Sequence, residues 1–289
     1  MNKKILSIIT ILICVASLHC NAFATQATSN TGNLCFDGCN AALLWYRTSS
    51  EMRAVHHQIY HFATMLIKQK VTDEGLKPGT WGIVADLDAT ILDTSWLELK
   101  RHIGGKKSRS TPTELMDALR SDKTETTVVP GALSFLKEVE KLGGYISFVT
   151  NRDTSVKIRT KYALKRLNIP YNQVMFYRKD NNKTKEETGK PRHAKTKEDR
   201  FFAIANGVIP YTLPQHDILM FIGDSIIDFP GMAKEIESDN FNAKVWDSQM
   251  HDKFSKFGTE FIILPNPTYG AWMKNCESTP NINNSTNSK

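Results

Sequence analysis

The sequence lacks an uninterrupted apolar stretch of membrane-spanning length. A segment that crosses a bilayer needs about 20 apolar residues, and the candidate nearest to that length is the largely apolar segment 5–18. Two lysines precede this segment, and Ala22-Phe-Ala24 follows it with the small-x-small pattern of a cleavage site. The sequence therefore predicts a signal peptide over residues 1–24 and a periplasmic or secreted protein with no transmembrane segment.

A lipid anchor at Cys20 is the alternative to free export. It would make the chain an outer-membrane lipoprotein. His19, directly before this cysteine, is bulky where a lipoprotein signal has a small residue. Lipid attachment is therefore disfavoured.

Cysteine is scarce, with five in 289 residues. Cys35, Cys39 and Cys276 remain after the predicted cleavage. In an oxidising compartment, three cysteines most simply give one disulfide and one free thiol, and the pairing stays open. No second Cys or His pair lies at ligand spacing from Cys35 and Cys39, which disfavours a zinc site.

The chain also lacks a concentrated charge of one sign. The formal net charge of +7 includes the two lysines of the predicted signal peptide, and the other basic residues are spread along the sequence. The densest basic run, 178–200, mixes Lys and Arg with acidic and polar residues. We interpret most of it as a solvated loop followed by the start of a helix. A nucleic-acid polymer is not an expected partner.

Apolar patterning predicts an α/β fold. Residues 40–69 have apolar side chains at helical intervals and no Gly or Pro, which indicates a helix. Beyond residue 80, short apolar runs alternate with helical segments, a pattern typical of a doubly wound parallel sheet flanked by helices. The expected strands are 82–86, 145–150, 174–177, 218–222 and 261–264, and the expected helices between some of them are 130–142 and 154–167.

We expect one domain over residues 25–273. It would contain an N-terminal helical part, 36–78, and a Rossmann-like core, 81–273, with a cap-like insertion at 94–129. The N-terminal helix and the insertion would form a smaller, mainly helical part. Residues 277–289 are almost entirely polar, and we expect this tail to be disordered.

Carboxylates follow two of the expected strands. Asp86 ends the first and Asp88 follows it, Asp224 and Asp228 come after the fourth, and Thr150 ends the second. A buried sheet has no structural use for clustered charge, and ligands bind at the carboxyl edge of such sheets. An oxygen-only donor set favours Mg²⁺. The pattern predicts a metal-dependent phosphoryl-transfer site.

These motifs resemble those of the haloacid dehalogenase superfamily. Segment 86–90, Asp-Leu-Asp-Ala-Thr, is similar to its first motif, 149–152 to its second and 223–229 to its fourth. Within the superfamily, the chain resembles the bacterial class C acid phosphatases, the four-aspartate type that includes outer-membrane lipoprotein phosphatases. Segment 45–60 is similar to the N-terminal helix of that family, and 264–272, Leu-Pro-Asn-Pro-Thr-Tyr-Gly-Ala-Trp, to its C-terminal signature.

The resemblance implies a role for each motif residue. Asp86 would be the nucleophile that forms an aspartyl-phosphate, and Asp88 the general acid and then the general base. Mg²⁺ would be held by Asp86, Asp224 and the backbone carbonyl of Asp88, with Asp228 as a supporting carboxylate. The groups expected to bind phosphate are Thr150, Asn151 and Lys197, with Lys195 as the alternative lysine.

The resemblance also implies the substrates, which would be small phosphomonoesters, namely nucleoside monophosphates and aryl phosphates, and would include 5′-nucleotidase activity. Trp96 and Tyr269 are candidates for stacking on a base or aryl group, with core packing as the alternative for each. The sequence departs from the family at Ala89, where an acidic residue is usual, and at Ser225, where Asn is frequent. The first departure bears on substrate preference and the second on metal geometry.

Three other functions are alternatives on the same fold. A phosphotransferase would pass the same aspartyl-phosphate to an alcohol, and the sequence leaves this open. A non-catalytic binding protein on the same fold is disfavoured, because all four aspartates are present. Dehalogenase chemistry is also disfavoured, since it needs neither Asp88 nor the metal carboxylates.

Overall fold

The computed structural model describes residues 34–105, 114, 117–118, 126–177, 197–208, 213–232 and 254–270. Ala42–Ser278 is one compact unit. The predicted signal peptide, the tail, Lys195 and Cys276 lie outside the described residues, as do the side chains of Cys35 and Cys39. Predictions for these parts stay predictions. In the described part of the chain, no helix combines the length and apolar character needed to cross a membrane.

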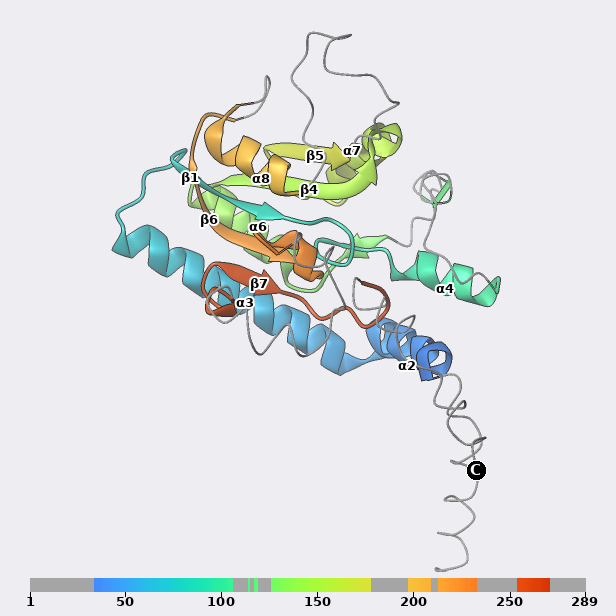
Figure 1. The fold of residues 1–289 in the computed structure, drawn as a ribbon. Helices are drawn as coiled ribbons and strands as arrows, with labels where there is room; N and C mark the ends of the chain where they lie inside the picture. The colour runs from blue at the N-terminus through green and yellow to red at the C-terminus, as the bar shows by residue number, and fades with distance from the viewer. Residues whose placement is uncertain are drawn as a thin grey trace, which may run out of the picture. The chain divides into compact units, whose positions relative to one another are not determined.

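The central sheet has five parallel strands in the order β5-β4-β1-β6-β7 (Figure 1). Their bounds are β1 Trp81–Ala85, β4 Tyr145–Asp153, β5 Gln173–Tyr177, β6 Asp217–Gly223 and β7 Phe261–Ile263. The chain runs outward from β1 through β4 to β5, then returns to the other side of β1 with β6 and β7. This order confirms the predicted doubly wound parallel sheet, and it places the topological switch point beside β1.

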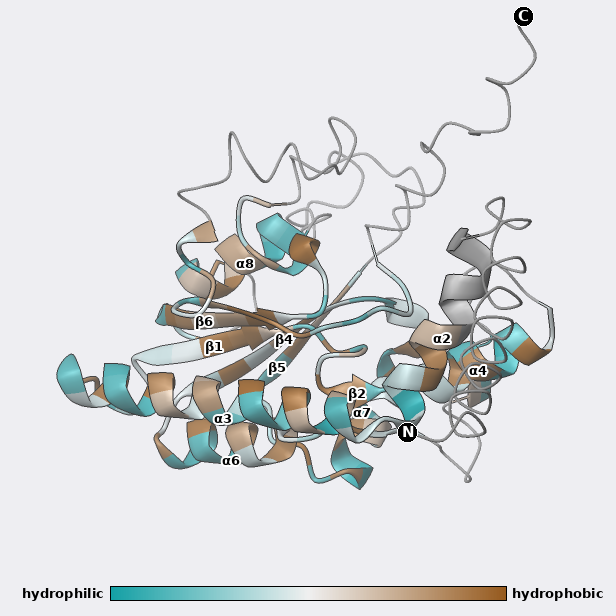
Figure 2. Cartoon of the chain, turned by 90° about the horizontal axis from the view of Figure 1, so that it is seen from below, coloured by the Kyte–Doolittle hydropathy of each residue, from teal (hydrophilic) through white to brown (hydrophobic). Residues whose placement is uncertain are grey.

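Apolar side chains of β1 divide between the two faces of the sheet, because successive residues of a strand point to opposite sides. Ile83 belongs to the main core, to which helix α3 (Ser50–Asp73) also contributes. Val84 belongs to the core on the opposite face, with Phe201 of helix α8 (Lys197–Asn206). Figure 2 shows α3 and α6 (Ala132–Lys141) on one side of the sheet and α8 on the other. All five residues of β1 are buried.

The helices have the bounds α2 Leu34–Thr48, α3 Ser50–Asp73, α4 Ser95–Ile103, α6 Ala132–Lys141, α7 Lys157–Arg166 and α8 Lys197–Asn206. The prediction of one continuous helix over 40–69 was wrong at Ser49. This residue has an extended backbone, and its side chain accepts a hydrogen bond from the Met52 amide at 2.9 Å. It therefore caps the start of α3 and separates this helix from α2.

The insertion after β1 contains a short antiparallel pair, β2 Leu92–Asp93 and β3 Thr127–Val128, in addition to α4. Sequence periodicity did not indicate this pair, because two residues are too few to show alternation. The indole N–H of Trp96 donates to the Thr126 hydroxyl at 3.2 Å. Arg166 of α7 donates to the carbonyl of Thr126 at 3.2 Å. Thr126 thus connects α4 to the core.

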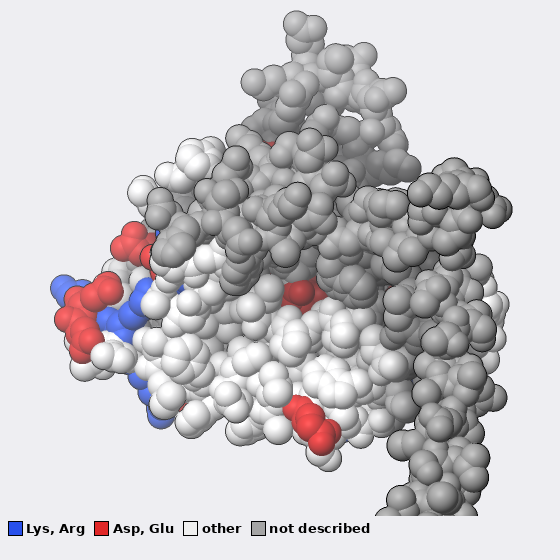
Figure 3. Space-filling model, turned by 60° about the horizontal axis from the view of Figure 1, so that its bottom comes forward, with Lys and Arg blue, Asp and Glu red and all other residues white. Residues whose placement is uncertain are grey.

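Charged side chains of the described residues are unevenly spread over the face in Figure 3. Lys and Arg gather at its left margin beside Asp and Glu, and most of the other described residues on this face are uncharged. This arrangement places no continuous basic patch on the described part of that face. The absence of a nucleic-acid partner stays a prediction.

Candidate active site

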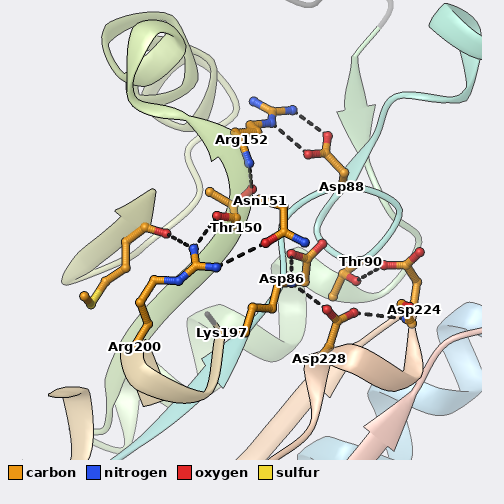
Figure 4. A network of polar contacts seen from close by, with 12 residues as sticks. Asp86, Asp88, Thr90, Thr150, Asn151, Arg152, Lys197, Arg200, Asp224 and Asp228 are labelled. Atoms are coloured by element: carbon orange, nitrogen blue, oxygen red, sulfur yellow. Dashed lines mark hydrogen bonds and ion pairs between the residues drawn. The ribbon is translucent and has the colours of Figure 1, made fainter. Parts of the chain in front are cut away.

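The polar residues of the site come from the carboxyl ends of three adjacent strands. Asp86 directly follows β1, and its amide donates to the carbonyl of Ile222 in β6 at 2.9 Å. Thr150 lies within β4, and Asp224 directly follows β6. Because β1 pairs with both β4 and β6, these residues lie at one edge of the sheet (Figure 4). The predicted meeting of the strand ends is confirmed.

Three carboxylates form a compact cluster at this edge. Asp86, Asp224 and Asp228 each offer one oxygen, and these oxygens lie within 4.8 Å of one another. Asp228 ends the short 3₁₀ helix η2 Ile226–Asp228, and its Oδ2 accepts the amide N–H of Ser225 at 3.0 Å. The backbone of Ser225 makes this contact, so the departure from the usual Asn leaves the position of Asp228 supported.

Lys197 supplies positive charge directly to the cluster. It begins α8, is buried, and its Nζ lies 2.5 Å from Asp86 Oδ1 and 2.5 Å from Asp228 Oδ1. Burial alone would lower the pKa of Lys197, but the carboxylates of Asp228 and Asp86 outweigh this effect and raise it. Lys197 is therefore a permanent cation between two of the aspartates.

One lysine leaves the cluster short of positive charge. The pKa of Asp86 is raised to about 7, because burial, together with the neighbouring charges of Asp228 and Asp88, outweighs the lowering effect of Lys197. Burial also raises the pKa of Asp224 well above its ordinary value, with Asp228 and Asp86 adding to the shift. A cation that brings these oxygens together would offset the repulsion.

The donor set fits a hard divalent cation. All three groups of the cluster offer carboxylate oxygens, which are the donors that Mg²⁺ and Ca²⁺ prefer, and no thiol or imidazole belongs to the described cluster.

The loop after Asp86 bends sharply, because Ala89 has a left-handed backbone with φ of 56°. Ala89 is buried, and packs with Tyr46 and Met52. Ala89, at a position where an acidic residue is usual in the family, thus packs in an apolar cluster.

Asp88 has a separate cationic partner. Arg152 Nε donates to Asp88 Oδ2 at 2.9 Å and its Nη2 donates to Oδ1 at 2.7 Å. Figure 4 shows the Asp88 carboxylate turned toward this guanidinium. Arg152 is almost fully buried, whereas the Asp88 side chain is 28% exposed. Arg152 belongs to segment 149–152, which resembles the second motif, but the sequence indicated no role for it.

Thr150 and Asn151 are held in place by a second buried arginine. Arg200 Nη1 donates to the Thr150 carbonyl at 2.6 Å, and its Nη2 donates to Asn151 Oδ1 at 3.1 Å. Burial lowers the pKa of Arg200 to about 10. The interpretation of the 178–200 run as solvated was wrong for Arg200, which is 1% exposed. Its position one helical turn after Lys197 on α8 was the available signal.

The two stacking candidates lie in different surroundings. Trp96 is 8% exposed and packs with Leu97 and Ala118 of the insertion. Tyr269 packs against the cluster of Tyr46, Met52 and Ala89. Burial raises the pKa of Tyr269, and the charges of Asp224 and Asp88 raise it further. The structure brings Tyr269 to the site, and stacking by either ring stays a prediction.

Asp224 has two neutral donors to which sequence reasoning assigned no role. The Thr90 hydroxyl donates to its Oδ1 at 3.1 Å, and the Asn266 amide donates to its Oδ2 at 2.7 Å. Thr90 ends the first motif, and Asn266 belongs to the C-terminal signature. Both motifs therefore meet at this one carboxylate.

A sheet edge that combines an aspartate cluster, a buried lysine and a second aspartate two residues after Asp86 is typical of phosphohydrolases of the haloacid dehalogenase type. Comparison with known families agrees, since residues 9–272 match the family described as HAD superfamily, subfamily IIIB (Acid phosphatase). The chain belongs to this family, and the predicted resemblance to class C acid phosphatases is confirmed. It is an acid phosphatase, with phosphomonoesters as the supported substrate class.

Solved structures of a class C acid phosphatase are similar to this chain. The enzyme from Bacillus anthracis with tungstate bound is 27% identical, with a TM-score of 0.65, and the match covers 83% of this chain and 89% of that chain. A second structure of the class C enzyme from the same organism is 28% identical, with a TM-score of 0.62 and the same coverage. The parallel sheet flanked by helices is thus shared.

Proposed function

We propose that this chain hydrolyses phosphomonoesters through an aspartyl-phosphate on Asp86, with Mg²⁺ as the cofactor. The observation that carries the proposal is the position of Asp86. It lies at the end of the central strand, within the cluster that includes Asp224 and Asp228, and in contact with Lys197. A buried carboxylate with this set of partners is suited to attack phosphorus, provided that it is ionised.

Ionisation of Asp86 depends on local positive charge. Lys197 provides one such charge, while burial and the adjacent carboxylates act in the opposite direction. Mg²⁺ would be held by Asp86, Asp224, Asp228 and the backbone carbonyl of Asp88, and it would supply electrostatic stabilisation for the carboxylates and the phosphate oxygens. The lysine alone cannot neutralise both the cluster and a phosphate dianion.

The reaction takes place in two displacements. An oxygen of Asp86 attacks phosphorus, the bond from phosphorus to the leaving oxygen breaks, and Asp88 gives that oxygen a proton. Water then attacks the aspartyl-phosphate and loses a proton to Asp88, which restores Asp86 and releases phosphate. The Asp88 side chain is partly exposed, so the leaving group and water can reach it.

The phosphate is held by donors on two elements. Thr150 and Asn151 come from β4, and Lys197 comes from α8. Arg200 supports this arrangement, because its guanidinium donates to Asn151 Oδ1 and so orients the amide nitrogen of Asn151 away from Arg200. The tungstate in the similar B. anthracis enzyme is consistent with a site for a tetrahedral oxyanion.

The substrates are nucleoside monophosphates and aryl phosphates. Tyr269 packs against Ala89 of the first motif, and stacking of its ring on a base or aryl group would add about 1 kcal/mol. Hydrolysis of the nucleoside monophosphates would be a 5′-nucleotidase activity. The enzyme acts in the periplasm or outside the cell, after export directed by residues 1–24.

The test is phosphate release from p-nitrophenyl phosphate and from nucleoside monophosphates between pH 4 and pH 8, with Mg²⁺ or with EDTA. We expect release with an acidic optimum that EDTA suppresses and that Asp86→Asn abolishes. An added alcohol acceptor distinguishes hydrolysis from phosphotransfer, since transfer yields a new phosphoester. Activity that persists in Asp86→Asn would contradict the proposed nucleophile.

A further inference from the structure

Asn266 is a buried amide in direct contact with the carboxylate cluster. It is 8% exposed, and its Nδ2 donates to Asp224 Oδ2 at 2.7 Å. Its other side-chain atom, Oδ1, accepts the amide N–H of Thr268 at 3.0 Å and the hydroxyl of Thr268 at 2.6 Å. Both ends of the amide are thus engaged by the protein.

Chemistry fixes the orientation of this amide. An ionised carboxylate can only accept hydrogen bonds, and a backbone N–H can only donate one. The NH₂ group of Asn266 must therefore face Asp224, and its oxygen must face Thr268. The reverse orientation would place an oxygen against a carboxylate and leave a donor against a donor.

The backbone brings Asn266 to the end of β6. Leu264, just beyond β7, donates its amide N–H to the carbonyl of Gly223 at 2.8 Å, which continues the pairing between the two strands. Gly223 directly precedes Asp224, so the segment that carries Asn266 is anchored beside the carboxylate it contacts. A shift of this segment would move the amide relative to Asp224.

The two oxygens of Asp224 differ in their contacts. Oδ2 accepts the short bond from Asn266, while Oδ1 accepts the longer bond from Thr90, at 3.1 Å. The hydrogen bond to Oδ2 restrains the side-chain rotation of Asp224. Oδ1 is then the oxygen more available to coordinate a cation. Neighbours that orient ligand side chains commonly set metal affinity in this way.

We propose that Asn266 is a positioning residue for the divalent cation, which orients Asp224 toward Asp86 and Asp228, and that Thr268 fixes the orientation of Asn266. This inference rests on the proposed function in one respect, because it needs the cluster to hold Mg²⁺. The segment after β7 would then have a role in metal binding in addition to its pairing with the end of β6.

A purely structural role makes a different prediction. If Asn266 only secures the segment after β7, its loss lowers the stability of the metal-free chain but leaves the affinity of the folded protein for Mg²⁺ unchanged. If Asn266 orients Asp224, the affinity falls even where the protein is fully folded. Metal affinity and metal-free stability must therefore be measured separately.

The experiment is titration of Mg²⁺ into the metal-stripped chain by isothermal calorimetry, with thermal unfolding in EDTA as the measure of folding. We expect Asn266→Ala to weaken Mg²⁺ binding by about 10- to 100-fold. Thr268→Ser keeps the hydroxyl and should bind as the wild type does. Thr268→Val keeps only the backbone donor, and its affinity should lie between those of the wild type and Asn266→Ala.

The possible outcomes distinguish failure of this inference from failure of the proposed function. Wild-type Mg²⁺ affinity in a folded Asn266→Ala chain would overturn the role of Asn266 and leave the proposed cofactor intact. Absence of Mg²⁺ binding by the wild type would instead overturn the cofactor, and this inference with it. If Asn266→Ala does not fold, the Thr268→Ser and Thr268→Val pair decides, and equal affinities in that pair would refute the inference.

Discussion

Arg152 forms a forked ion pair with Asp88, in which two guanidinium nitrogens each donate to a different carboxylate oxygen. A third nitrogen of Arg152, Nη1, donates to the Thr160 hydroxyl at 3.0 Å, so the guanidinium is fixed by α7 as well. The two carboxylates of the first motif thus have different cationic partners, since Asp88 contacts Arg152 and Asp86 contacts Lys197. In the proposed reaction these two aspartates also have two different roles.

Replacement of Arg152 by lysine should lower kcat. A lysine keeps the positive charge but cannot make the two parallel hydrogen bonds that set the direction of the Asp88 carboxylate. Misplacement of a catalytic group by about 1 Å can cost on the order of 100-fold in rate. We expect Arg152→Lys to reduce kcat by about 10- to 100-fold, with a smaller change in KM, in steady-state assays with p-nitrophenyl phosphate.

The control for this substitution is Arg166→Lys. Arg166 also bridges two parts of the chain, but it donates to a backbone carbonyl away from the carboxylates. Its replacement should change kcat much less. Equal kcat values for the wild type and Arg152→Lys would contradict the positioning of Asp88 by this arginine.

Removal of the Lys197 charge should destabilise the metal-free protein. Lys197→Met would leave Asp86 and Asp228 buried without their common partner, and loss of one member of a buried ion pair typically costs about 3–5 kcal/mol. We expect a loss of this size in the free energy of unfolding, measured with urea in EDTA at pH 7.5. The loss should shrink at pH 5, where Asp86 can take up a proton instead.

Lys68→Met provides the matched comparison. Lys68 pairs with Glu138 at 3.1 Å, but its side chain is 52% exposed. Exposed pairs of this kind contribute about 0–1 kcal/mol. A similar loss of stability for the two lysine variants would show that burial of the Lys197 pair has no special effect.

The stability of the metal-free chain should fall as the pH rises toward 7. The pKa of Asp86 is raised by burial to about 7 in the folded chain, from an ordinary value of 3.8. Between these values the folded chain holds a proton that the unfolded chain has lost, so each increase in pH favours unfolding. The raised pKa of Asp224 acts in the same direction. Thermal unfolding in EDTA should therefore give a lower Tm at pH 7 than at pH 5.

Two further measurements identify the source of this pH effect. Asp86→Asn removes the titrating group and should flatten the dependence. Mg²⁺ should raise the Tm more at pH 7 than at pH 5, because protons compete with the cation for the same carboxylates. A Tm in EDTA that increases steadily from pH 5 to pH 7 would contradict the raised pKa of Asp86.

The sequence predicted the sheet and its functional edge because the relevant signals are local. Each apolar run ends where its strand ends, and the carboxyl ends of parallel strands meet regardless of what connects them. Lys197 was predicted from a family pattern, and its contacts with Asp86 and Asp228 agree with its place in the site. The roles of these residues in catalysis stay predictions.

Other parts of the site depend on contacts between distant segments, and apart from the helical spacing of Arg200 after Lys197 no local pattern indicates them. Arg200 is 49 residues from Asn151, and Asn266 is 42 residues from Asp224. Polar side chains in loops and at the starts of helices are usually solvated, so composition alone favoured exposure. The break at Ser49 was missed for a different reason, since the apolar spacing continues across the capping residue.

The central claim is that Asp86 carries the phosphoryl group during turnover, and mass spectrometry tests it most directly. Wild-type chain and Asp86→Asn would be quenched in acid during hydrolysis of p-nitrophenyl phosphate, then digested and analysed for phosphorylation. We predict one phosphoryl group on the peptide that contains Asp86 in the wild type, and none in Asp86→Asn. Rapid turnover by the wild type with the phosphoryl group on another residue, or on none, would contradict the account.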